Sequence, residues 1–322
     1  MYQIVLEPKF SYVCNTQTKV SAYRKHTKKE KEGIKVTDLQ NRILSIYEDI
    51  RKICIDNKIT YFAIGGTCIG ALRHKGFIPW DDDLDIAIPI EQFNKFINIA
   101  NKTLPKYLEI QTGNNIEHTK NFFIKVVDKR STFIQMHELP YPDAYKGVFV
   151  DIMPISGIPK SRLRRLLFYK RVKTLFLLNE IRRLPTTESK GIKRTIRKII
   201  SGIIKPFSFD YFYNKYMKML KHNPFCNSEL TGYVWSLRVK KLTFPTDYFS
   251  DTESYDFEHT LMSCPIKADK YLSMQFGNYM QLPPIQEQKT CHDGIVIIDK
   301  PYTDFVDNNE LLNDYIDNRN EE

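Results

Sequence analysis

Apolar residues recur at helical spacing soon after an N-terminal stretch without clear periodicity. A helix is predicted to begin at Thr37 or Asp38, either of which can cap it, and to end at the polar residues 56–58. Its apolar positions follow the i, i+3, i+4 pattern and are Leu39, Ile43, Ile46, Tyr47, Ile50 and Cys54. A second amphipathic helix is predicted directly after Pro89, because proline favours the first turn of a helix.

Short runs of β-branched and aromatic residues predict strands around these helices. The run TYFAIGG predicts a buried strand that ends in a tight glycine turn, and TCIGALR after it predicts a short helix. The run LDIAI predicts the next strand. Further strands are expected at 107–112, 121–128, 131–135 and 147–155. Strands and helices mixed in this way predict an α/β or α+β fold with a central mixed sheet.

The second half of the chain is predicted to begin with basic helices, which are followed by strands near 232–235 and 256–262 and a short helix near 267–275. The chain is therefore predicted to divide into an N-terminal arm (1–35), an α/β core (36–159), a basic helical segment (160–222), a C-terminal part of the core domain (223–305) and an acidic tail (306–322).

The composition, with 42% hydrophobic and 13% aromatic residues, is that of a folded protein. The first residues lack the pattern of a signal peptide, and no run of about 18 apolar residues occurs, so no secretion or membrane span is expected. The scattered cysteines suggest no disulfide framework and favour a cytoplasmic location. His259, Cys264, Cys291 and His292 are zinc-type ligands, although their spacing does not require a metal.

The net charge of +10 arises in one segment of the chain. Residues 160–205 contain 15 Lys and Arg against two acids, Glu180 and Glu188, so this segment carries +13 and the remainder −3. Because the cations alternate with Leu, Phe and Ile, we expect the segment to contact an anionic membrane surface. A packed helical subdomain with a solvated basic face remains an alternative. A nucleic-acid partner is not expected, because no binding motif accompanies the charge.

The densest cluster of candidate chemistry is the sequence WDDDLDIAI, which begins at Trp80. Bare carboxylates at this density repel one another, so a cation is expected beside them. Side chains alternate along a strand, which predicts that Asp81, Asp83 and Asp85 share one face while Leu84 points into the core. Carboxylate oxygens favour Mg²⁺ or Mn²⁺. A solvated acidic turn and a calcium loop are the simpler alternatives, but the twelve-residue calcium pattern is absent.

Two further features favour a site for metal and phosphate. Gly65, Gly66 and Thr67 lie between a predicted strand and a predicted helix, where backbone N–H groups and a hydroxyl can meet phosphate oxygens. Asp151 is a single carboxylate inside the predicted strand 147–155. A glycine turn, a D-x-D pair and an isolated strand carboxylate are together more specific than any one of these features.

This combination resembles the nucleotidyltransferase superfamily, and the long connection between the glycine turn and the acids resembles the LicD family. The stretch YFAIGGTCIGALRHKGFIPWDDDLDIAI carries the resemblance, and FIKVVDKRSTFIQ, VFVDIMPISG and YLSMQFGNYMQLPP follow in the family's order. The resemblance covers roughly residues 36–292 and is weakest in the basic segment. It implies a nucleotidyltransferase-type mixed sheet flanked by helices, with a catalytic core, a basic helical insertion and a small C-terminal block.

The resemblance also implies roles for individual residues. Asp83, Asp85 and Asp151 match the catalytic and metal-binding acids, with Asp81 as an outer ligand. The residues expected at the donor phosphates and nucleotide are Gly65, Gly66, Thr67, Arg73, Lys125 and Arg130. Those expected near the substrate are His74, Lys75 and His292.

The implied activity is an Mg²⁺- or Mn²⁺-dependent transfer of a phospho-alcohol, with phosphocholine the foremost candidate. The donor is a CDP-alcohol, and the acceptor is a hydroxyl of a cell-surface glycan or its lipid-linked precursor. Asp151 is the expected general base. The expected location is the cytoplasm, at the inner face of the membrane. Two alternatives remain, a nucleotidyltransferase that acts on a small molecule and a non-catalytic binding protein of the same fold.

Overall fold

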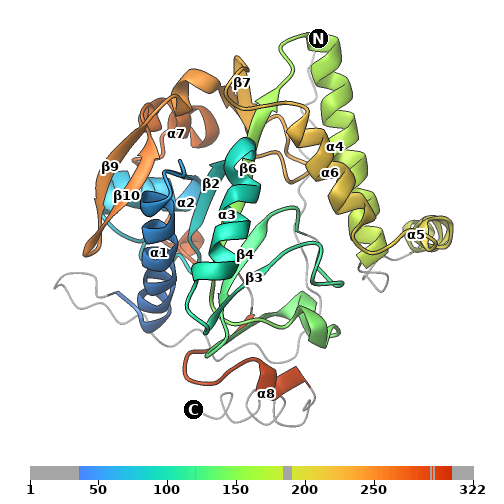
Figure 1. The fold of residues 1–322 in the computed structure, drawn as a ribbon, viewed down its shortest axis with the longest axis horizontal. Helices are drawn as coiled ribbons and strands as arrows, with labels where there is room; N and C mark the ends of the chain where they lie inside the picture. The colour runs from blue at the N-terminus through green and yellow to red at the C-terminus, as the bar shows by residue number, and fades with distance from the viewer. Residues whose placement is uncertain (1–35, 120, 184–190, 291, 293, 307–322) are drawn as a thin grey trace. The chain divides into compact units, whose positions relative to one another are not determined.

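The computed structural model describes residues 36–119, 121–183, 191–290, 292 and 294–306 (Figure 1). The predicted N-terminal arm and almost all of the predicted acidic tail lie outside these residues. Within the described part, helices alternate with the strands of a mixed sheet, which confirms the predicted α/β class.

The central sheet is built around one long buried strand, β6. Its strands are β1 (Phe62–Ala63), β2 (Asp85–Pro89), β3 (Leu108–Gln111), β4 (Ile124–Asp128), β6 (Phe149–Ile158), β7 (Leu230–Gly232) and β8 (Thr243–Pro245). The strand order is β1-β2-β6-β4-β3, and β7 pairs with the second half of β6 and with β8. β2 and β6 are parallel, whereas the other neighbouring pairs are antiparallel. The first half of β6 thus lies between β2 and β4.

Two smaller sheets are antiparallel pairs. β5 (Thr132–Gln135) pairs with β11 (Gly294–Ile297), and β9 (Thr252–Phe257) pairs with β10 (Thr260–Pro265). The single strand predicted at 256–262 is therefore wrong, because Glu258 turns the chain there with a left-handed φ of 54°. The strand predicted at 232–235 lies earlier, in β7.

Helices α1 (Asp38–Asp56) and α3 (Ile90–Thr103) lie in front of the sheet in Figure 1 and pack against β6. Thr37 and Gln40 form a reciprocal capping box at the start of α1, as the sequence predicted for Thr37. The Gln40 amide also donates to the carbonyls of Ile78 (3.4 Å) and Asp81 (3.1 Å). The beginning of α1 therefore fixes the loop that carries the acidic residues.

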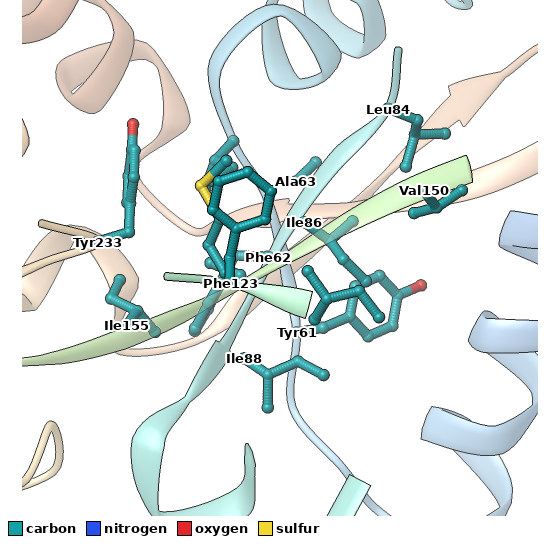
Figure 2. Packing of buried hydrophobic residues seen from close by; sticks show 14 of the residues in the cluster. Tyr61, Phe62, Ala63, Leu84, Ile86, Ile88, Phe123, Val150, Ile155 and Tyr233 are labelled. Carbon is teal, nitrogen blue, oxygen red and sulfur yellow. The ribbon is translucent and has the colours of Figure 1, made fainter. Parts of the chain in front are cut away.

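The sheet and the helices enclose one large hydrophobic core, part of which is shown in Figure 2. Phe62, Ile86 and Val150 come from β1, β2 and β6 and are at most 1% exposed. Each such side chain contributes about 1.5–3 kcal/mol when it is fully buried. Close packing on these strands leaves little freedom in the positions of the polar residues at the start of β2 and in β6.

Several short helices and turns connect the strands of the sheets or follow the last strand. After β1 the chain forms α2 (Gly65–Ile69), which continues as a π-helix over Gly70–His74, so the short helix predicted there is present. α7 (Ala268–Phe276) coincides with the helix predicted near 267–275, and α8 is Thr303–Val306. The 3₁₀ turns are Met136–Glu138, Pro142–Ala144, Thr246–Phe249 and Ile285–Glu287.

The basic segment forms α4 (Arg162–Arg183), α5 (Ile192–Ile204) and α6 (Tyr211–Lys221), as its helical spacing predicted. α6 packs against α3 and β6, and α4 packs against both α5 and α6. Arg183, at the end of α4, is fully buried. Its guanidinium donates to the carbonyls of Gly113, Ile116 (2.6 Å) and Glu117 (3.1 Å), which ties α4 to the loop after β3.

Arg183→Ala is expected to lower the free energy of unfolding by about 3 kcal/mol, because it leaves buried carbonyls without a donor. Arg171→Ala, on the exposed face of the same helix, serves as the control and should change stability by less than about 0.5 kcal/mol. Chemical denaturation of both variants measures the difference. Equal stabilities would show that Arg183 does not anchor the loop.

Candidate active site

The glycine turn lies directly against the acidic residues. Gly65 has a φ of +56°, which favours glycine, and the first turn of α2 begins there. A Cβ at Gly66 would lie 2.7 Å from Asp81 Oδ2, and a Cβ at Gly65 would lie 3.7 Å from Asp85 Oδ2. Gly66 therefore allows a close approach between the turn and the acids that any side chain would obstruct.

The turn is held from behind by tyrosines that sequence reasoning missed. The Gly65 N–H donates to the Tyr271 hydroxyl (2.8 Å). Tyr271 and Tyr233 share a hydrogen bond between their hydroxyls (2.7 Å), and the Tyr233 hydroxyl also donates to Gln275 (2.6 Å). Tyr271 lies within the family-like stretch YLSMQFGNYMQLPP, which was the signal that could have located it.

Thr67 connects the glycine turn to β2. Its buried hydroxyl accepts a hydrogen bond from the Asp85 N–H at 2.8 Å. Its hydroxyl oxygen thus fixes the start of the strand that carries Asp85, and the contact of Thr67 with the donor phosphates remains a prediction.

The acids do not all lie on one strand face. Since β2 begins at Asp85, Asp81 and Asp83 lie in the preceding loop, and the predicted strand alternation is wrong for them. Asp82 is 3% exposed and is more deeply buried than Asp81 and Asp83. The orientation of the Asp81 and Asp83 side chains is therefore set by a loop that Gln40 holds, and not by the alternation of a β-strand.

Asp85, Asp151 and Lys125 form a row across three adjacent strands. Asp85 of β2 lies opposite Asp151 of β6, and Asp151 lies opposite Lys125 of β4. The Lys125 ammonium donates to Asp151 Oδ1 at 2.5 Å and lies 3.5 Å from the centre of the Phe149 ring. Both charged groups are buried, at 6% and 5% exposure. The row brings together three of the predicted site residues.

A second buried cation, Lys146, lies near this row and was not expected from the sequence. It is 1% exposed, forms an ion pair with Glu138 and lies 5.5 Å from the same Phe149 ring. Burial lowers the pKa of Lys146. Lys125, Lys146 and Glu138 line one pocket, so the two lysines and the acid paired with Lys146 lie side by side next to the row. The other lining residues are Gln111, Thr112, Ile116, Thr119, Asn121, Phe123 and Ala144.

Burial and mutual repulsion disfavour the ionised forms of the acids. Burial, with the charges of Asp83 and Asp82, raises the pKa of Asp81 to about 8. Burial raises the pKa of Asp83 to about 6 even though His292 and Lys125 oppose the shift. Burial and the nearby Asp83 raise the pKa of Asp85 well above its usual range. A divalent cation would relieve this repulsion, so the donor set fits a hard metal ion.

His292 joins the acidic loop from the C-terminal part of the chain. Its Nδ1 lies 3.0 Å from Asp82 Oδ1 and 3.7 Å from Asp83 Oδ2. Burial works against the charged imidazole, but the hydrogen bond to Asp82 and the charge of Asp83 outweigh burial and raise the His292 pKa. Ligand atoms of Asp82, Asp83 and His292 lie within 4.8 Å of one another, so this group is a second arrangement able to hold a metal.

Arg73, His74 and the backbone of Lys75, between the glycine turn and the acids, make structural hydrogen bonds. Arg73 donates to the carbonyls of Tyr279 and Gln281 and to the His74 ring (2.9 Å). Lys75 has a left-handed φ of 57°, and its carbonyl accepts from the Glu258 N–H. These contacts connect the π-helix to the β9–β10 hairpin and to the loop after α7. The predicted roles of Arg73, His74 and Lys75 toward donor or substrate remain predictions.

Arg130 is not brought together with the acids by any of its described contacts. It forms a bidentate pair with Asp128 (3.0 and 2.7 Å) and stacks on Tyr107 at 3.6 Å.

The possible zinc ligands are not grouped together among the residues that the structure describes, which include His259, Cys264 and His292 but not Cys291. His259 is exposed beside Glu48, and Cys264 is buried.

The glycine turn, the acids that open β2 and the third carboxylate opposite them on β6 have the arrangement of the nucleotidyltransferase class. A family model described as the LicD/FKTN/FKRP nucleotidyltransferase domain matches residues 58–191, which include all of these features. Residues 58–191 are therefore similar to the nucleotidyltransferase domain of the LicD family. The match begins after α1 and extends through the whole of α4.

Individual relatives agree with this assignment. The chain is 26% identical over 258 residues to the lipopolysaccharide cholinephosphotransferase LicD of Haemophilus influenzae, an alignment that covers 77% of this chain and 92% of that protein. The uncharacterized protein RT0683 of Rickettsia typhi is 33% identical over 126 residues, 38% of this chain and 35% of that protein. The similarity to the cholinephosphotransferase thus extends well beyond the domain match.

Mg²⁺ is expected to bind these acids more strongly at high pH, because their raised pKa values keep them protonated at low pH. Because folding raises these values, the metal-free protein is expected to lose stability as the pH rises through about 6 for Asp83 and about 8 for Asp81. Mg²⁺ competes with protons for the same oxygens. The rise in Tm that Mg²⁺ causes should therefore be larger at about pH 8 than at about pH 5.

Thermal unfolding with and without Mg²⁺ measures this effect, and Asp85→Asn should abolish it. Asp256→Asn, an exposed aspartate on β9, is the matched control and should behave as the unsubstituted protein. A Tm that Mg²⁺ leaves unchanged at both pH values would contradict a metal site at these acids.

Proposed function

We propose that this chain is a LicD-type phosphotransferase that moves phosphocholine from CDP-choline to a hydroxyl of a lipopolysaccharide glycan or its lipid-linked precursor. The row of Asp85, Asp151 and Lys125 beside the glycine turn carries the proposal, because it lies inside the LicD-family domain. The similarity to a lipopolysaccharide cholinephosphotransferase supports the choice of transferred group and acceptor.

The reaction requires an attacking hydroxyl and a leaving nucleotide on opposite sides of one phosphorus atom. The acceptor oxygen forms a new bond to the choline-bearing phosphorus, the bond from that phosphorus to the bridging oxygen breaks, and CMP leaves with the electron pair. Bound Mg²⁺ or Mn²⁺ would stabilise negative charge on the phosphate oxygens. Its main ligands would be Asp85, which opens β2 beside the glycine turn, and Asp83, which lies in the loop just before it, with Asp81 and Asp151 as further oxygen donors.

The chain's own residues bind and orient the substrates. The N–H group of Gly66 is close to the acids, where it can donate to a phosphate oxygen, whereas the Gly65 N–H is bonded to the Tyr271 hydroxyl and holds the turn in place. Lys125 contributes a buried positive charge on the same side of the sheet. Asp151 is the proposed general base and takes the proton of the acceptor hydroxyl. The ammonium of Lys125 holds the Asp151 carboxylate in position through its short hydrogen bond.

CMP release from CDP-choline in the presence of Mg²⁺ and a lipopolysaccharide acceptor is the direct assay of this function. The unsubstituted protein should release CMP, and Asp85→Asn should reduce the rate by at least about 100-fold because the phosphate charge loses its stabilisation. Asp256→Asn should keep the normal rate. Pyrophosphate release from CTP with a small-molecule acceptor, without CMP release from any CDP-alcohol, would instead identify a nucleotidyltransferase.

The role of Asp151 is tested separately from metal binding. Asp151→Asn keeps the shape of the side chain but cannot accept the hydroxyl proton, so kcat should fall about 10²–10⁴-fold. The Mg²⁺-dependent rise in Tm should remain, because Asp83 and Asp85 are unchanged. Normal turnover in this variant would remove Asp151 as the base.

A further inference from the structure

The outer face of α5 exposes a continuous stripe of isoleucines. Ile192, Ile196, Ile199 and Ile203 are 77%, 50%, 60% and 69% exposed. Their spacing of four, three and four residues places them along one side of the helix. The adjacent side, with Ile200 and Ile204, packs against the end of α4 and the start of α6. The exposed stripe is therefore not needed to hold α5 on the protein.

A second apolar stripe lies on α4. Leu163, Leu166, Leu167 and Leu177 are 67%, 46%, 49% and 44% exposed, on the side opposite the buried residues Phe168 and Val172. A water-facing helix surface normally carries polar residues at such positions. Exposed apolar side chains grouped on one side of a helix mark a surface that meets a partner.

Both helices are strongly basic. α4 contains eight Lys and Arg and α5 contains four, against a single acid, Glu180. Glu180 is itself paired with Arg197 at 3.4 Å. Lys170 lies among the exposed leucines of α4, and Arg164 and Arg171 border them, all three exposed to solvent. Exposed leucines thus lie directly beside positive charge.

We infer that α4 and α5 form a docking surface for an anionic lipid bilayer, with the leucine and isoleucine stripes inserted between headgroups and the cations against lipid phosphates. No helix among the described residues is both long and apolar enough to cross a membrane. In Figure 1, α5 projects from the end of α4 away from the sheet that carries the acids. The inference does not rest on the proposed reaction, although a lipid-linked acceptor would make such docking useful.

The charge and the apolar side chains of this surface favour a bilayer over a second copy of the chain or a nucleic acid. A second copy of the chain packed through the same helices would bring like charges together, which is unfavourable in a symmetric interface. Single-stranded nucleic acid is bound by cations combined with aromatic stacking, whereas the exposed rows here are leucine and isoleucine. Anionic lipids match both the aliphatic rows and the positive charge.

Co-sedimentation of the full chain with vesicles tests the inference without any substrate. The protein should bind vesicles of phosphatidylcholine with phosphatidylglycerol at low salt, bind phosphatidylcholine alone weakly, and lose affinity as salt increases. The double variant Ile196→Glu, Ile199→Glu should bind at least about tenfold more weakly, because apolar insertion is lost and negative charge is added.

Ile55→Glu is the matched control, since Ile55 is 55% exposed on α1, and it should bind as the unsubstituted protein does. Lys170→Glu with Arg171→Glu should weaken binding to the anionic vesicles and leave the weak binding to neutral ones unchanged. Circular dichroism checks that each variant is folded. Absence of binding to the anionic vesicles at low salt would overturn the inference, as would unchanged binding by the isoleucine variant.

Two other results would reassign the surface and also overturn the inference. One is a dimer that the isoleucine double variant converts to a monomer while vesicle binding is absent. The other is binding to a random-sequence oligonucleotide without binding to vesicles. Loss of vesicle binding alone would leave CMP release with a detergent-solubilised acceptor intact, so failure here is distinguishable from failure of the proposed reaction.

Discussion

The parallel pairing of β2 with β6 is the constraint on which the candidate site depends. It places Asp85 opposite Asp151, and the antiparallel pairing of β6 with β4 places Lys125 opposite Asp151 on the other side. A shift of one residue in either pairing would turn these side chains to the opposite face of the sheet. The register is maintained by the packing of buried residues such as Ile86 and Val150 (Figure 2). The hydrophobic core therefore determines the spacing of the charged groups.

The parts of the site that are not in the sheet are held by residues from distant segments. Gln40 at the start of α1 binds the carbonyl of Asp81, and Tyr271 of α7 binds the N–H of Gly65. Thr67 joins the glycine turn to the Asp85 N–H. Supporting hydrogen bonds of this kind lock groups on a loop, which a loop alone holds less accurately than a strand does. Acids crowded into such a loop with raised pKa values are poised to exchange protons for a metal ion.

Local patterns in the sequence predicted much of this arrangement. They did not predict the features that depend on contacts between distant parts of the chain. The capping residue Thr37, the helix after Pro89 and the strand around Asp151 follow from short-range propensity and periodicity, and the structure confirms them. The strand alternation predicted for Asp81 and Asp83 is wrong because β2 begins only where it pairs with β6. That pairing starts at Asp85. The ion pair of Lys146, the hydrogen bond of Tyr271 to the glycine turn and the stacking of Arg130 on Tyr107 come from tertiary packing, which local sequence patterns do not encode.

The central claim is that the acids around β2 hold a divalent cation that binds the donor's phosphates. The most direct measurement is a crystal structure of the protein with Mn²⁺ and CDP-choline, in which anomalous scattering locates the metal. The account predicts an anomalous peak about 2 Å from carboxylate oxygens of Asp83 and Asp85, with the donor phosphates as further ligands. A peak coordinated only by Asp82 and His292, or no peak near these acids with the donor bound, would contradict it.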